Sequence, residues 1–185
     1  MKTAINLISN IRFGFYTQPE ASGQIPYLQV RQFDEQGNLK DEANEFVKSD
    51  SKSEQQLLSD GDVLFVGKGN RLFAWCYRES AGPYIASSIF FVLQPNQKLI
   101  YPEYLTAILN APQTKAAFLQ LGAGTNIFSI RKSELGAVEI PILPLDTQKR
   151  IASLAVLHQK QILLSQKLIA QKQNLYTTII SKLIN

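Results

Sequence analysis

The sequence predicts an α+β protein, in which a β-rich domain with short helices, residues 1–145, is followed by one long helix, residues 146–185. Three observations support this fold class. Residues 146–185 contain neither glycine nor proline. Residues 63–66 form a continuous apolar run, which is typical of a strand buried on both faces. Pro102 and Pro112 each precede a short stretch that suits a helix.

The N-terminal part of the chain predicts short elements. Glycine and proline occur in residues 1–33 at intervals that leave room only for short elements. Residues 27–33 alternate with the period of a half-buried strand, and residues 34–38 would end it in a turn. Residues 39–58 are polar and charged, so we expect a long loop or an exposed helical turn there.

The middle of the chain predicts the β-rich core, followed by short helices. A turn at 57–62 leads into the strand 63–66. Two further strands are expected at 72–78 and 84–93, then helices at 104–110 and 113–120, a break at 122–126, and strand candidates at 128–130 and 137–140. Ser87 and Ser88 would lie in the middle of the strand 84–93.

The long helix has an entrance that the sequence marks clearly. Pro141 and Pro144 favour an extended approach, and Asp146 is placed to act as the N-cap. At about 1.5 Å per residue the helix would be roughly 55 to 60 Å long, which exceeds the width of a domain of this size. Much of it would then project and need a partner, although a helix folded back onto its own domain is the alternative.

Apolar residues along this helix return in pairs every seven residues, which predicts a coiled-coil-like seam for dimerisation. Polar residues in the column between the pairs, such as Ser165 and Lys172, weaken the seam but can set register and orientation. The predicted seam residues are Ile151, Leu154, Ala155, His158, Ile162, Leu168, Ile169, Leu175, Tyr176, Ile179 and Leu183.

Charge is distributed unevenly along the chain. Residues 1–145 carry 13 basic and 14 acidic side chains, a balance of −1, whereas residues 146–185 carry six basic residues and one acidic residue, a balance of +5. A polyanion would therefore be met by local patches of the domain. The single Cys76, the missing export signal and the missing long apolar window predict a protein of the reducing cytoplasm that does not span a membrane.

The inventory of catalytic and metal-binding groups is small. His158 is the only histidine, so neither a histidine-containing metal cluster nor a Ser/His/Asp set can be assembled. Residues 67–69 and 122–124 are only fragments of a glycine-rich dinucleotide loop. Asp60 and Asp62 suit a turn better than a metal site, and Cys76 suits the core. A small nuclease that uses Asp62 is the enzymatic alternative.

A series of short motifs follows a fixed order along nearly the whole chain. The most specific is the closing motif Ile140-Pro141-x-x-Pro144-Leu145-Asp146-x-Gln148-Lys149-Arg150-Ile151, joined to a long helix. It is preceded by Gly37, Leu58–Phe65, Gly67-x-Gly69-Asn70, Ile85–Phe91, Pro102–Leu105 and Gly124–Ile130. Taken together, this order resembles a target-recognition module of the specificity subunit of type I restriction–modification enzymes.

The resemblance implies a non-catalytic subunit that reads double-stranded DNA and binds no cofactor. Separate methyltransferase subunits would bind S-adenosylmethionine and methylate adenine, and a restriction subunit is a further candidate partner. The family form resembles two such modules in tandem with antiparallel helices, whereas this sequence has one. It is then either a half-subunit that forms an antiparallel homodimer and reads a bipartite palindrome, or a truncated, regulatory copy that pairs with a full specificity subunit.

The expected DNA contacts are polar side chains in loops and at strand edges. The best candidates are Lys68, Asn70 and Arg71, because glycines beside Lys68 would let the backbone approach the duplex and Arg71 could read guanine. The second group of candidates is Arg78, Thr125, Asn126, Arg131 and Lys132, followed by Arg31 and Ser87. A solvated surface charge is the alternative for each basic residue.

Overall fold

The computed structural model describes residues 2–40, 44–121 and 129–184 and has the α+β composition that the sequence predicts. It divides into two compact units, Met1–Lys149 and Arg150–Asn185, which are described separately here. The first unit contains every strand and the helices α1 to α5, and the second is the continuation of the long helix α6.

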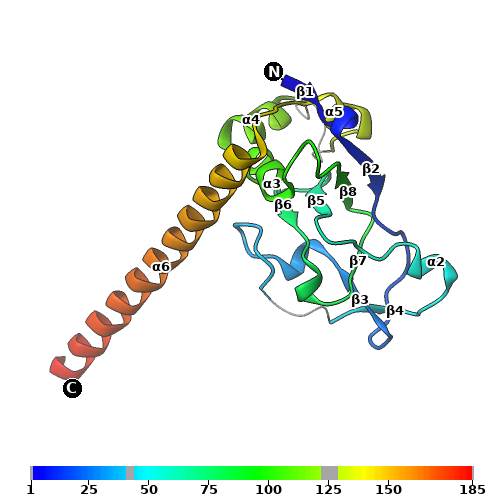
Figure 1. Ribbon diagram of the computed structural model, residues 1–185. Coiled ribbons are helices and arrows are strands. Elements are labelled where there is room, and N and C mark those ends of the chain that lie inside the picture. Colours follow the sequence, from blue (N-terminus) through cyan, green and yellow to red (C-terminus); the bar gives the residue numbers. More distant parts are fainter. Residues whose placement is uncertain (1, 41–43, 122–128, 185) are drawn as a thin grey trace. The chain divides into compact units, whose positions relative to one another are not determined.

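The strands of the first unit are short and form three sheets (Figure 1). The strands are β1 (Lys2–Ala4), β2 (Ser9–Phe13), β3 (Ile25–Leu28), β4 (Phe46–Val47), β5 (Val63–Val66), β6 (Ala74–Cys76), β7 (Ile85–Ala86), β8 (Phe90–Pro95) and β9 (Glu139–Pro141). The helices are α1 (Ile5–Ile8), α2 (Ser51–Glu54), α3 (Pro102–Asn110), α4 (Pro112–Leu121), α5 (Lys132–Ala137) and α6 (Leu145–Ile184), with 3₁₀ turns at Val30–Gln32 and Glu79–Ala81.

The largest sheet has four antiparallel strands in the order β2-β8-β5-β6. All four residues of β5 are buried, as its unbroken apolar run predicts. The two smaller sheets are β1-β9 and β4-β3-β7, in which β3 and β7 are parallel. Pairing of β1 with β9 joins the two ends of the domain, since Thr3 lies opposite Ile140.

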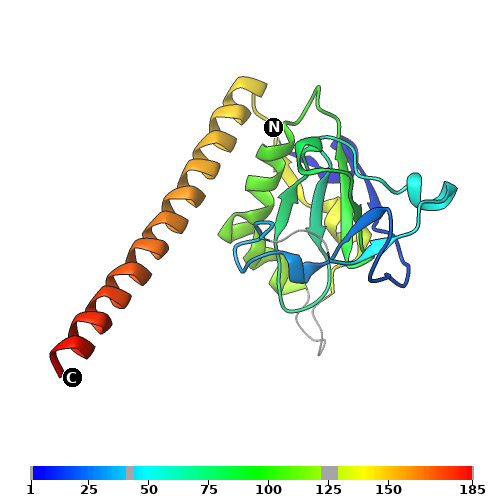
Figure 2. The same ribbon diagram turned by 90° about the horizontal axis from the view of Figure 1, so that it is seen from below.

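Helices α3 and α4 cover one side of the four-stranded sheet (Figure 2). The Asn110 side chain of α3 accepts from the Ala74 amide at 3.0 Å and donates to the Ala74 carbonyl at 2.8 Å, which satisfies the backbone of β6. Phe118 of α4 packs against Phe65 of β5 with ring centroids 5.0 Å apart. Both helices lie where the prolines predict them, each with a proline as its first residue.

Three strand predictions need correction. The expected strand 27–33 ends at Leu28, because the Gln29 amide donates to the Gln32 side chain and the chain turns into a 3₁₀ helix. The expected strand 84–93 is divided into β7 and β8 by a turn in which the Phe90 amide donates to the Ser87 carbonyl at 3.0 Å. The expected strand 72–78 is shorter, Ala74–Cys76.

Several elements of the domain were not predicted individually. Strands β1 and β2 and helix α1 lie in a stretch that the glycine and proline spacing left without assignment, and β4 lies in the expected loop 39–58. Helix α5 begins between the strand candidates 128–130 and 137–140. The predicted break at 122–126 and Phe128 lie outside the described residues.

The long helix α6 begins one residue earlier than expected, at Leu145, so Asp146 lies in its first turn and is not the N-cap. Its negative charge still suits the positive end of the helix dipole. The side chain of Gln148 is fully buried next to it. It accepts from the Tyr101 amide at 2.8 Å and donates to the carbonyls of Leu99 and Leu143 at 3.0 and 2.8 Å.

Candidate nucleic-acid interface

Four segments that are distant in sequence meet at one end of the four-stranded sheet. They are the end of β2 with the residues after it, the loop after β5, the turn before β8 and the residues that enter α5. We call this region the convergent surface and define it as residues 13–16, 67–70, 87–90 and 129–131. Lys132, the first residue of α5, instead lines a cavity with Asn10 and Gln94, which pair at the other end of β2 and β8.

Backbone hydrogen bonds hold these segments side by side. The Gly14 amide donates to the Phe90 carbonyl at 2.9 Å, and the Gly67 amide donates to the Ile89 carbonyl at 3.2 Å. The Ile130 amide then donates to the Gly67 carbonyl at 2.8 Å. The antiparallel register explains the meeting point, because the ends of β2 and β5 both lie beside the start of β8.

Glycines shape the loop of the convergent surface that follows β5. A Cβ added to Gly67 would lie 2.2 Å from the Phe91 ring, so only glycine fits beneath that ring. Gly69 has a φ of +103°, which L side chains rarely adopt, and nothing lies within 4 Å of its Cβ position. The loop therefore holds Lys68 and Asn70 exposed on an unobstructed turn.

The exposed polar groups of the convergent surface are suited to an anion. Lys68, Asn70 and Arg131 are all exposed, and the four segments contain no acidic residue. The Glu134 carboxylate, just beyond them, accepts from the Arg131 amide at 2.7 Å. The ion pairs in the described part of the chain involve neither Lys68 nor Arg131. A duplex phosphate could pair with them without displacing an intramolecular carboxylate.

Arg71, a candidate for reading guanine, is engaged within the domain. Its Nη1 donates to the carbonyls of Val30 and Phe33 at 3.0 Å each, and its Nη2 donates to the carbonyl of Asp34. Its guanidinium also lies 5.2 Å from the centroid of the Phe73 ring. These contacts explain why the chain turns after β3, and a base contact by Arg71 would have to break them.

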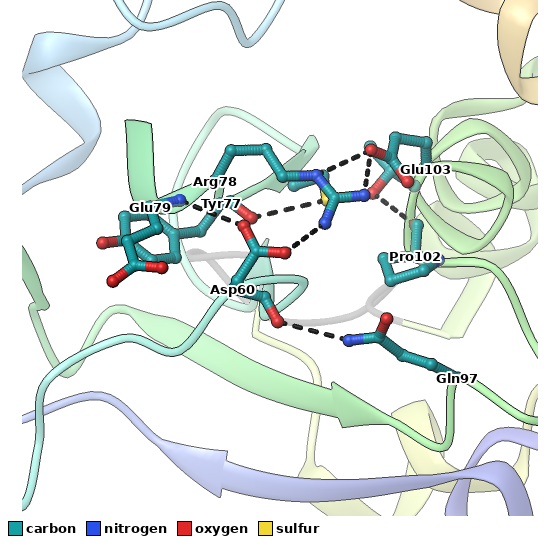
Figure 3. Close-up of polar contacts among 9 residues, drawn as sticks. Asp60, Tyr77, Arg78, Glu79, Gln97, Pro102 and Glu103 are labelled. Atoms are coloured by element: carbon teal, nitrogen blue, oxygen red, sulfur yellow. Dashed lines mark hydrogen bonds and ion pairs between the residues drawn. The ribbon is translucent and has the colours of Figure 1, made fainter. Parts of the chain in front are cut away.

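Arg78 is also engaged within the domain, in the ion-pair cluster that Figure 3 shows. Its Nη1 lies 2.6 Å from Oδ2 of Asp60, its Nε donates to Oε1 of Glu103 at 2.8 Å, and its Nη2 pairs with the same oxygen. Burial alone would lower the pKa of Arg78, but the hydrogen bonds that its guanidinium donates to Glu103 and Asp60 raise it. The cluster joins the residues after β6, the turn before β5 and the first turn of α3.

The turn containing Asp60 and Asp62 has the structural role that the sequence favoured. The Glu79 amide donates to Asp60 at 3.1 Å, and this bond and Arg78 lower the pKa of Asp60. Asp62 is buried and accepts from the Ser59 amide at 3.0 Å, while desolvation raises its pKa. In the described residues no group of three or more His, Cys, Asp or Glu side chains could hold a metal ion.

The remaining candidates are distributed differently. Arg31 pairs with Glu45 and is half exposed. Ser87 belongs to the convergent surface, but it is 7% exposed and its Oγ has no hydrogen-bond partner in the described structure. Thr125 and Asn126 lie outside the described residues. Cys76 is a free thiol whose pKa burial raises to about 12, so it is an unreactive group of the domain.

Helix α6 carries apolar side chains along its length. Exposed members of the predicted seam include Leu154, Leu168, Ile169, Leu175, Tyr176, Ile179 and Leu183. Leu157 and Leu164 are 64% and 56% exposed, and sequence reasoning missed them. They are seven residues apart, and they precede the seam residues Leu168 and Leu175 by eleven residues each, so they widen the apolar face at the edge of the seam. We call Leu157 and Leu164 the second stripe.

The described part of the chain has no helix with the length and apolar content that crossing a bilayer requires.

Comparison with known proteins finds one matching family and several similar solved structures. The family described as "Type I restriction modification DNA specificity domain" matches residues 11–174. No curated protein sequence matches the chain. Among solved structures, a chain from a study of complex assembly and conformational transition of the type I R-M system superposes with a TM-score of 0.69 at 16% identity.

Two further solved structures have the same fold. The type I restriction–modification S subunit from M. genitalium gives a TM-score of 0.62 at 15% identity, and the HsdS subunit from Thermoanaerobacter tengcongensis gives 0.63 at 18%. The three superpositions cover 93%, 90% and 90% of this chain and 41%, 41% and 39% of the other chains. The chain thus spans about two fifths of the length of these proteins.

Proposed function

The chain belongs to the family of type I restriction modification DNA specificity domains, and we propose that it reads DNA sequence and scaffolds a methyltransferase complex without catalysing a reaction itself. The observation that carries this proposal is the convergent surface, where Lys68, Asn70 and Arg131 are exposed and the four segments contain no acidic residue. Cations without carboxylate partners attract the phosphate backbone.

Within the convergent surface the residues have different proposed roles. Lys68 and Arg131 contact phosphates and fix the register of the domain on the duplex. Asn70 reads a base edge, because a carboxamide can form two hydrogen bonds with adenine in the major groove. Arg71 and Arg78 support the surface from within, since their guanidinium groups are already hydrogen-bonded to the domain.

Helix α6 makes the proposed assembly two-fold. The seam defined by residues such as Ile162 and Ile169 pairs with the seam of a second copy in antiparallel orientation, which is an isologous contact. Each copy then reads one half of an interrupted palindrome, and the helix length sets the distance between the halves. Avidity between the two domains offsets the weak attraction expected from a nearly neutral domain.

The second stripe of α6, Leu157 and Leu164, is the proposed contact for a methyltransferase subunit. That subunit, and not this chain, binds S-adenosylmethionine in the proposed complex, and a restriction subunit is a further partner. An apolar face that is broader than one coiled-coil seam suits contact with more than one neighbouring element.

The proposal is tested by mapping adenine methylation on DNA treated with the chain together with its cognate methyltransferase subunits. We expect an interrupted palindrome. Asn70→Ala should relax one position of each half-site, whereas Lys68→Ala should weaken binding to all sequences and reduce its salt dependence by about one phosphate contact.

Lys98→Ala is the matched control, because Lys98 is exposed beyond the opposite end of β8. Methylation without sequence preference would overturn the proposal. A chain that stays monomeric but binds a full-length specificity subunit would favour the regulatory alternative. Metal-dependent cleavage by the pure protein that is lost in Asp62→Ala would favour a nuclease.

A further inference from the structure

Phe13 is an exposed aromatic residue at the edge of the convergent surface. It is the last residue of β2, an edge strand of the four-stranded sheet, and its side chain is 54% exposed. Its ring packs against that of Phe91 on β8, with centroids 5.0 Å apart and planes at 40°. One side of the Phe13 ring is therefore held by the sheet while the rest faces solvent.

Phe91 links this exposed ring to the loop after β5. The Phe91 ring lies so close over Gly67 that a Cβ there would approach it to 2.2 Å. Phe13, Phe91 and Gly67 thus form a continuous row across the end of β2, β8 and β5. Lys68 and Asn70 follow Gly67 directly, so the apolar edge of Phe13 belongs to the same surface as the proposed phosphate and base contacts.

Exposure alone would not single out Phe13, because single apolar side chains on protein surfaces are common. The surroundings of Phe13 do single it out. The convergent surface carries two exposed cations, Lys68 and Arg131, and none of its four segments contains a carboxylate, which favours a polyanion over an apolar protein surface as the occupant. A rigid ring at such a site can contact the one apolar group that bases present in the major groove, the 5-methyl group of thymine.

We propose that Phe13 contacts the 5-methyl group of a thymine in each half-site and so contributes to sequence discrimination. This inference rests on the proposed DNA-reading function. The held ring is suited to the role because packing on Phe91 fixes its position before binding, which lowers the entropic cost of the contact. Tyr16, 87% exposed three residues later, is the neighbouring aromatic residue that must be distinguished from it.

The test uses a duplex with the methylation motif of the parent complex, in which each thymine is replaced in turn by deoxyuridine. The parent complex should bind one substituted duplex roughly three- to tenfold more weakly, because only a methyl contact is lost. Phe13→Ala should bind the thymine and deoxyuridine duplexes equally, and Phe13→Leu, which keeps an apolar group on Phe91, should retain part of the discrimination.

Leu119→Ala, which truncates a 57% exposed side chain on α4, should discriminate as the parent does. Discrimination that is lost in Tyr16→Ala but kept in Phe13→Ala would assign the contact to Tyr16 and overturn the inference. Thermal unfolding of each variant separates loss of contact from loss of fold. No discrimination by the parent at any thymine, or discrimination that survives Phe13→Ala, would overturn the inference while leaving the proposed function intact. A parent complex that methylates without any motif would overturn both.

Discussion

Gln148 shows how one side chain can connect three parts of the domain. Its amide satisfies the Tyr101 amide before α3 and the carbonyls of Leu99 and Leu143, and it is fully buried while doing so. A buried polar group that loses its hydrogen-bond partner costs more free energy of folding than a surface hydrogen bond contributes. The residue therefore anchors the first turn of α6 to the domain from which that turn begins.

Gln148→Ala should lower the free energy of unfolding by about 2 to 4 kcal/mol, since one amide is lost and three backbone groups lose their partner. Urea unfolding at constant pH measures the change. Gln171→Ala, an exposed glutamine of the same helix, should shift the midpoint only slightly. Equal stability of Gln148→Ala and the parent would mean that water replaces the buried amide without cost.

The observed environments of single residues also show which parts of the candidate site could be predicted from the sequence. Lys68 and Asn70 were identifiable because flanking glycines are a local signal, and both are exposed. Arg71 stands beside them in sequence but bonds carbonyls of Val30 and Phe33, which no local pattern indicates. Phe13 was missed for the same reason, because its position follows from the pairing of β2 with β8.

At the scale of elements, local signals and long-range pairing account for the difference between predicted and observed structure. Helices α3, α4 and α6 were predicted from proline positions and periodicity, and β5 from its apolar run. Strand β2, helix α5 and the turn between β7 and β8 depend on partners far along the chain. Their stabilisation is tertiary, so a single sequence window carries little trace of it.

Helix α6 permits two matched double variants, one in the seam and one in the second stripe. Ile162→Asp with Ile169→Asp places charges in the seam, and we expect a dimer to become a folded monomer because buried, unpaired carboxylates are costly. Leu157→Asp with Leu164→Asp alters the second stripe, and we expect a dimer that no longer binds a methyltransferase subunit. Sedimentation of each variant, alone and with that subunit, measures both outcomes.

The roles of the two stripes can be compared directly, because each double variant introduces two aspartates into the same helix and only their position differs. If both variants dissociate the dimer, the apolar face is one broad dimer interface and the proposed division between partners is wrong. A parent that is monomeric at high concentration would show that the seam requires a different partner or folds back on its own domain.

At the scale of the whole assembly, the length of α6 sets the distance between the two proposed half-sites. The helix has 40 residues, which corresponds to roughly 60 Å at about 1.5 Å per residue. Two recognition domains at opposite ends of an antiparallel pair would move apart when both helices are lengthened by whole heptads, because seven residues restore the same seam.

Insertion of seven residues after Ile169, copying the seven that precede the insertion point, should lengthen the helix by about 10.5 Å. Because base pairs of duplex DNA are spaced about 3.4 Å apart, the spacer between half-sites should grow by roughly three base pairs while the half-site sequences stay unchanged. Methylation mapping of the lengthened complex measures this directly. An insertion of four residues is the control, since it rotates the seam out of register and should abolish the dimer. An unchanged spacer with intact dimerisation would show that another subunit, and not α6, sets the distance.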